Sequence, residues 1–178
     1  MTASIVVCPQ SRLAEVLAAT GARHVVTLLA ADRRAGLPPM PGVARLMLDA
    51  SDITAPRDGF ALPGADHVAD LLGFARAWDR HRPLVLHCYA GVSRSTAAAY
   101  AVACALRPER GEAEIAASLR RASPSATPNP RLIALADDAL GRAGRMVDAI
   151  RAIGRGRDCF EGDVFALDVP DRREAAAV

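Results

Sequence analysis

A cysteine and an arginine stand six positions apart near the middle of the chain, at Cys88 and Arg94. The five residues between them are Tyr89, Ala90, Gly91, Val92 and Ser93. A cysteine thiolate is a strong nucleophile, and an arginine guanidinium carries a planar fork of donors that can bind two phosphate oxygens at once. A loop that holds both side chains could therefore bind a phosphoryl group and attack its phosphorus atom.

The residues on either side of this pair predict such a loop. Leu84-Val85-Leu86 is a short, wholly apolar run, typical of a central strand that is buried on both faces. The alanine-rich run from about Arg94 to Leu106 predicts a helix, whose N-terminus offers unpaired N–H groups and the positive end of a dipole to an anion. Gly91 allows a tight turn. We therefore expect residues 89–94 to bind phosphate and to stabilise the Cys88 thiolate.

Two neighbours of the pair have expected roles of their own. The Ser95 hydroxyl could donate to the Cys88 sulfur and help it leave when a covalent phosphoenzyme is hydrolysed. His87 is expected to position the loop, and a hydrogen-bonded core histidine is an equally good interpretation. The Cys-x5-Arg spacing alone arises often by chance. The longer pattern His-Cys-x2-Gly-x-Ser-Arg-Ser between a strand and a helix is much more specific.

Strand-like and helical patterns alternate along the rest of the chain. Strands are predicted over residues 4–8, 24–29, 43–48 and 84–86, and helices over 11–20, 66–80, 94–106, 112–121, 131–140 and 143–153. This order predicts an α/β fold with a central, mainly parallel sheet flanked by helices in three layers. We expect one domain over residues 1–155 and a C-terminal extension, 156–178, that is partly packed or disordered and carries an apolar patch at 164–167.

The composition and the apolar runs of the chain argue against several classes of function. The chain has 178 residues, is 51% hydrophobic and carries a net charge of +2, which gives no reason to expect nucleic acid or a membrane as its partner. All 22 basic residues are arginine, so Schiff-base lysines and the phosphate-loop lysine of nucleotide triphosphatases are excluded. No signal peptide or apolar run of ~18 residues is evident. The oligomeric state stays open.

The four cysteines are Cys8, Cys88, Cys104 and Cys159. They form neither a CxxC pair nor a Cys/His cluster, so we expect free thiols, no metal, no cofactor and a cytoplasmic location. The sequence leaves open whether Cys8 or Cys104 forms a protective disulfide with Cys88.

The segment 87–95 resembles the signature loop of the protein tyrosine phosphatase superfamily, particularly its small, bacterial, dual-specificity-like members. The residues Arg121-Ala122-Ser123-Pro124, Pro128-Asn129-Pro130 and the helix 132–140 are similar to the segment that follows the signature helix in those proteins. The match covers about residues 43–140. The resemblance implies that Cys88 attacks phosphorus and forms a phosphocysteine, which water then hydrolyses without a metal. Arg120 and Arg121 are interpreted as a solvated helix end.

The resemblance also implies a general acid, an aspartate on a mobile loop after the preceding strand. The candidates are Asp49, Asp52 and Asp58. Asp52 is preferred because the acid usually sits just past the strand end, whereas Asp49 stands directly on it and is the alternative. Asp58 has the separation from Cys88 that the family suggests, but its Arg and Gly neighbours are typical of an ordinary turn.

Substrate and rival functions remain open at this level. Tyr89, Ala90 and Val92 carry no charge, which favours phosphoproteins, on tyrosine or another residue, or small phosphomonoesters over polyphosphorylated inositides. A pseudophosphatase would keep the loop but lack a working acid. An arsenate-reductase-like thiol enzyme also uses Cys-x5-Arg, although the small phosphatase-like type places this loop near its N-terminus.

Overall fold

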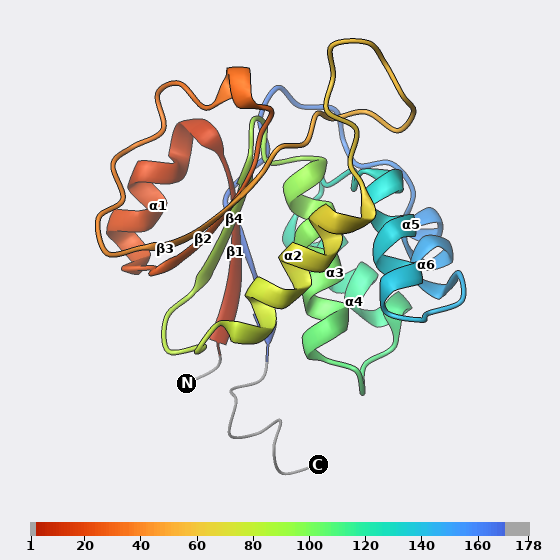
Figure 1. The fold of residues 1–178 in the computed structure, drawn as a ribbon. Helices are drawn as coiled ribbons and strands as arrows, with labels where there is room; N and C mark the ends of the chain where they lie inside the picture. The colour runs from red at the N-terminus through yellow and green to blue at the C-terminus, as the bar shows by residue number, and fades with distance from the viewer. Residues whose placement is uncertain (1–2, 170–178) are drawn as a thin grey trace.

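Five strands form one sheet in the computed structural model, which describes residues 3–169 (Figure 1). The strands are β1 (Ala3–Pro9), β2 (His24–Leu28), β3 (Ala44–Leu48), β4 (Leu84–Cys88) and β5 (Phe165–Val169). Their order across the sheet is β3-β2-β4-β1-β5, with β5 antiparallel to β1 and the other neighbours parallel. The strand that ends in Cys88 is therefore the central one.

Helices cover both faces of this sheet, in unequal numbers (Figure 1). One face is covered by α1 (Leu13–Thr20), and the other by α2 (Ala65–Ala77), α3 (Arg94–Leu106), α4 (Glu112–Ala122), α5 (Pro130–Ala139) and α6 (Arg145–Ile153). Two short 3-10 helices, η1 (Gln10–Arg12) and η2 (Ala31–Arg33), follow β1 and β2. The predicted α/β fold with a mainly parallel, three-layer architecture is confirmed.

The side chains of β4 alternate between two apolar clusters, because successive residues of a strand point to opposite faces. Leu86 and Cys88 belong to the larger cluster, beneath α2 to α6, whereas Val85 belongs to the smaller cluster beneath α1. All five residues of β4 are buried, as its uninterrupted apolar run predicts. The small side chains of α3 let that helix lie close to the sheet, and nearly the whole helix is buried.

The chain after α6 returns to the sheet. We call residues 154–164 the strap, because they cross from α6 to β5 over the carboxyl edge of the sheet. The strap is held by hydrogen bonds from Gly156 N to Thr127 Oγ1 (3.1 Å), from Arg157 N to Pro124 O (2.9 Å) and from Gly162 N to Ala90 O (2.8 Å). The expected apolar patch at 164–167 is largely part of β5. Residues 170–178 of the expected extension lie outside the described residues.

Arg120 connects α4 with the start of the strap. Its Nη1 donates to the carbonyl oxygens of Pro124 (2.8 Å) and Ala126 (2.9 Å), and its Nη2 donates to that of Gly154 (2.7 Å). The interpretation of Arg120 as a solvated helix end is therefore wrong, because carbonyls of the loop after α4 and of Gly154, 34 residues away, converge on its guanidinium. Within residues 3–169, no helix is long and apolar enough to cross a bilayer.

Candidate active site

The loop from Tyr89 to Ser93 joins β4 to α3 at the carboxyl edge of the sheet, where α/β folds bind ligands. Its carbonyl oxygens accept four hydrogen bonds from three surrounding segments: Gln10 N to Tyr89 O (3.1 Å), Gly162 N to Ala90 O (2.8 Å), Thr127 N to Val92 O (2.9 Å) and Asn129 N to Ser93 O (3.3 Å). The N–H groups of a trans peptide point opposite to its carbonyl. The carbonyl groups of the loop point outward, toward these donors. The N–H groups of the same peptides therefore point toward the inside of the loop, an arrangement in which backbone N–H groups can bind an anion.

Gly91 allows this loop to lie close against the end of β1. Its φ is +71°, and a Cβ at this position would stand 2.7 Å from Pro9 N and 3.0 Å from the Cys8 carbonyl carbon. Both atoms belong to the backbone and cannot move aside as a flexible side chain could. The glycine in the sequence pattern is thus required by a positive φ and by a close approach.

Cys88 lies at the base of the loop with its side chain almost fully buried, at 2% exposure. Its Sγ is 3.1 Å from the Oγ of Ser95, which is in the first turn of α3 and is also buried. The hydroxyl can donate to a thiolate at this distance. The structure therefore brings together the cysteine and the serine that the sequence pattern pairs.

Arg94 is 8% exposed, and its guanidinium is oriented by a hydrogen bond from Nη1 to Ala50 O (2.8 Å). Its Nε is buried and has no hydrogen-bond partner among the described residues. The nearest anionic atom is Asp52 Oδ2, at 4.0 Å. A buried donor without a partner costs free energy, and a phosphate oxygen in the loop would satisfy it. This arrangement fits an oxyanion site.

Asp52 is the candidate acid that contacts the loop. Its Oδ1 accepts hydrogen bonds from Ser93 Oγ and from Asn129 Nδ2, both at 2.8 Å. Its other oxygen, Oδ2, faces the Arg94 guanidinium at 4.0 Å. The carboxylate remains partly solvent-accessible, with 41% of the side chain exposed.

Of the other two aspartates, Asp49 lines the same pocket as Asp52 and Arg94, but neither it nor Asp58 is bonded to the loop after β4. Asp49 Oδ1 accepts from Ala31 N (3.1 Å) and is 3.7 Å from Arg34 Nη2, so this carboxylate is directed toward η2. Asp58 is exposed on the loop that follows β3, whose base is closed by a hydrogen bond from Ser51 N to Ala61 O (2.8 Å). Among the described residues, neither aspartate forms a hydrogen bond or an ion pair with residues 89–94.

Asn129 is a site residue whose role the sequence analysis missed. It is buried, and its Oδ1 accepts from Arg131 N and Leu132 N, both at 3.1 Å, as the N-cap of α5. An asparagine directly before a proline is a helix-start signal, so the cap was readable in the sequence. Its contact with Asp52 was not, because no local pattern joins residues that are 77 positions apart.

His87 lies below the loop, fully buried, with Nε2 2.7 Å from Thr27 Oγ1. Burial lowers the pKa of His87 to about 4, because the charged imidazolium loses its hydration. The ring is therefore neutral at pH 7. Its position supports a structural role for His87 in holding the end of β4 against β2.

Neither Cys8 nor Cys104 is placed to form a disulfide with Cys88. Cys8 lies in the cluster beneath α1, on the face of the sheet opposite to Cys88. Cys104 follows Arg94 by ten residues in α3, about 15 Å along the helix axis. Burial raises the pKa of Cys8 and that of Cys104 to about 12, so both thiols stay protonated.

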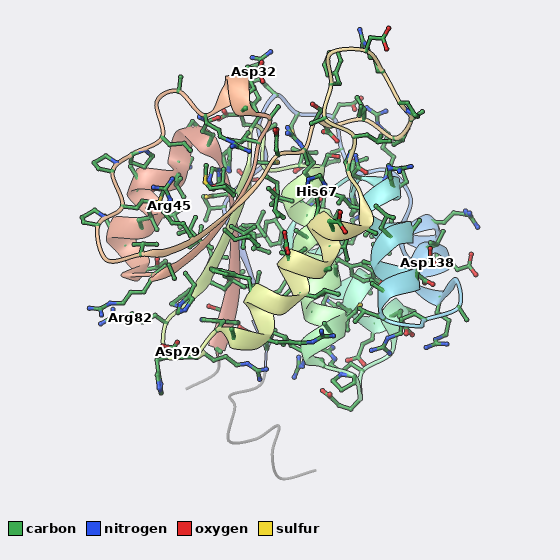
Figure 2. All side chains as sticks on the ribbon, in the orientation of Figure 1. Asp32, Arg45, His67, Asp79, Arg82 and Asp138 are labelled. Atoms are coloured by element: carbon green, nitrogen blue, oxygen red, sulfur yellow. The ribbon has the colours of Figure 1, made fainter. Side chains whose placement is uncertain are left out.

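The loop opens onto two pockets at the same edge of the sheet. One, of about 590 Å³, is lined by Asp52, Arg94 and Phe60 among others. The other, of about 500 Å³, is lined by Tyr89. Asp32 lines both pockets, and Figure 2 shows it on η2, at the end of the molecule where the loop after β3 also lies. No group of three or more His, Cys, Asp or Glu suited to a metal ion occurs among residues 3–169.

No family model matches the chain, and no curated protein gives a significant match to it. Several solved structures are similar. Human DUSP28 shares 22% identity at a TM-score of 0.58, with 83% of this chain and 94% of that chain covered. DUSP15 shares 17% identity at 0.58, covering 83% and 88%, and Tk-PTP in its active form shares 22% at 0.54, covering 75% and 88%. The chain therefore has the fold of the protein tyrosine phosphatase superfamily, in the small form found in dual-specificity phosphatases.

Proposed function

We propose that this protein is a cysteine-dependent phosphatase that hydrolyses phosphate monoesters through a phosphocysteine intermediate. One observation carries the proposal: the Cys88 sulfur, the buried Arg94 guanidinium and the Asp52 carboxylate all lie at the loop that joins β4 to α3, with Asp52 reaching it from the loop after β3. A nucleophile, a phosphate clamp and a proton donor are the groups that phosphoryl transfer to a thiolate needs. The transition state is loose, so positioning and charge neutralisation dominate the catalysis.

The proposed reaction has two steps. The Cys88 thiolate attacks phosphorus in line, a sulfur–phosphorus bond forms, and the bond from phosphorus to the ester oxygen breaks. Asp52 gives its proton to that oxygen, which leaves as an alcohol or phenol. In the second step Asp52 takes a proton from water, the water oxygen attacks phosphorus, and the thiolate leaves with a hydrogen bond from Ser95 Oγ. Inorganic phosphate is the second product.

The proposed substrates are phosphorylated protein residues, phosphotyrosine or others, with small phosphomonoesters as simpler substrates. The uncharged side chains of Ala90 and Val92 support singly phosphorylated substrates, because a second phosphoryl group would call for further cations in the loop. The free cysteines fit a reducing compartment, and we propose that the protein acts in the cytoplasm.

The test is hydrolysis of p-nitrophenyl phosphate in the presence of EDTA. We expect turnover by the wild type, none by Cys88→Ser, and wild-type turnover by Cys159→Ser, whose thiol is exposed on the strap. A wild-type protein that binds phosphopeptides without turning them over would be a pseudophosphatase. Reduction of arsenate with a thiol donor, without phosphatase activity, would identify the arsenate-reductase-like alternative.

A further inference from the structure

A second pocket adjoins the candidate active site on the side of the strap. It has a volume of about 500 Å³ and is lined by Tyr89, the residue that follows Cys88. It shares Asp32 and Arg33 with the larger pocket that contains Asp52 and Arg94. A phosphoryl group bound at Cys88 would thus have space on both of its sides, as a phosphorylated residue within a protein segment requires.

The strap supplies Glu161 to this second pocket and fixes its position. Glu161 Oε2 accepts a hydrogen bond of 2.8 Å from Ser11 Oγ. The next residue, Gly162, donates from its backbone N to Ala90 O, and a Cβ on it would stand 3.1 Å from Gly91 O. The backbone that carries Glu161 is therefore bound directly to the phosphate loop, so its carboxylate has a defined place relative to Cys88.

The other charges that line this pocket compensate one another. The Arg33 guanidinium is 3.5 Å from the Asp32 carboxylate and stands 5.8 Å over the Tyr89 ring. Glu161 has no ion-pair partner among the described residues.

Gln10 forms part of the wall of the same pocket. Its Nε2 donates to Arg33 O (3.2 Å), and its Oε1 is buried, so it does not face a ligand in the pocket. The uncompensated group that the pocket offers to an N–H donor is therefore the Glu161 carboxylate.

We propose that this pocket is a substrate subsite that binds an arginine or lysine side chain of a phosphorylated protein segment, with Glu161 as its ion-pair partner. The inference rests on the proposed phosphatase function and adds to it a sequence preference. The phosphoryl group of the substrate would then bind at Cys88 and Arg94, and its arginine or lysine side chain would bind in the adjoining pocket at Glu161.

The test uses phosphotyrosine peptides that differ at one residue. Arginine, glutamine or glutamate is placed at each of the three positions before and after the phosphotyrosine. The readout is the ratio of kcat/KM for arginine to kcat/KM for glutamine within one enzyme. We expect the wild-type ratio to reach about fivefold at one or two positions, the upper range for an exposed ion pair. Glutamate should fall below glutamine there.

Two variants locate the preference. Glu161→Gln keeps an oxygen that accepts from Ser11 but removes the charge, and we expect its ratio to fall to about one. Asp158→Asn is the matched control, because Asp158 also lies on the strap but pairs with Arg155 (2.6 Å) and does not line the pocket. Its ratio should equal that of the wild type.

A wild-type ratio of one at every position would overturn the inference, and so would an undiminished ratio in Glu161→Gln. Either result leaves the proposed function standing as long as the wild type hydrolyses the peptides. Absence of hydrolysis by the wild type, by contrast, would overturn the proposed function itself.

Discussion

The carboxylate of Asp52 and the side-chain amide of Asn129 are joined by a 2.8 Å hydrogen bond between segments 77 residues apart. Ser93 Oγ donates to the same carboxylate oxygen. Both donors bind Oδ1, whereas Oδ2 faces Arg94. Asn129 itself is fixed as the N-cap of α5. Asp52, the proposed acid, is thus tied both to the loop after β4 and to a helix.

Replacing Asp52 by asparagine should slow the transfer of the phosphoryl group to Cys88. We expect kcat to fall about 10²- to 10⁴-fold on phosphotyrosine, whose leaving group needs a proton. The loss should be smaller on p-nitrophenyl phosphate, whose leaving group departs more easily without one. Asp49→Asn is the control, and equal losses in the two variants would show that Asp52 is not the acid.

Two replacements of Asn129 should separate its roles. Asn129→Ser keeps a good N-cap but loses the donor to Asp52, so kcat should fall about tenfold with the free energy of unfolding nearly unchanged. Asn129→Ala loses both contacts and should also lower the free energy of unfolding by about 1 kcal/mol. Urea unfolding and steady-state kinetics check the two parts. Wild-type kcat in Asn129→Ser would rule out its positioning of Asp52.

Replacing Gly91 by alanine should distort the loop or unfold the protein, because its Cβ would meet the β1 backbone at 2.7 Å. We expect the free energy of unfolding to fall by at least ~2 kcal/mol and activity to be lost. Gly73→Ala is the control: Gly73 is exposed in α2, with nothing within 4 Å of a Cβ. That change should stabilise the helix by up to ~1 kcal/mol. Thermal or urea unfolding measures both variants.

Burial of neutral His87 should make stability depend on pH. Its pKa is lowered from 6.5 to about 4, so the unfolded chain binds more protons between these values and stability falls as the pH falls. From pH 7.5 to pH 5 this group should remove about 2 kcal/mol from the free energy of unfolding. Urea unfolding at the two pH values, compared with His87→Gln, isolates the contribution. An equal pH dependence in the variant would contradict a buried, neutral His87.

The sequence predicted those parts of the site that are local along the chain. The apolar run before Cys88, Gly91 and the alanine-rich run after Arg94 predict a strand, a tight turn and a helix, each from its own residues. The structure has all three, because burial on both faces, a positive φ and helix propensity act at short range. The mainly parallel α/β order was predictable for the same reason. The alternation of strand-like and helical spacing of apolar residues can be recognised in the sequence without knowing any tertiary contact.

Long-range packing decided the rest. The sequence preferred Asp52 from its place after β3, but only the fold shows that Ser93 and Asn129 bind its carboxylate while Asp49 is directed toward η2. The apolar patch at 164–167 gave no element by itself, because an edge strand is defined by its partner, here β1. The place of Glu161 beside the phosphate loop likewise depends on hydrogen bonds between distant segments. Short-range features can be predicted from neighbouring residues. A site that combines Asp52, the loop after β4, Asn129 and the strap forms only when the chain folds, because its contacts join residues that are distant in the sequence.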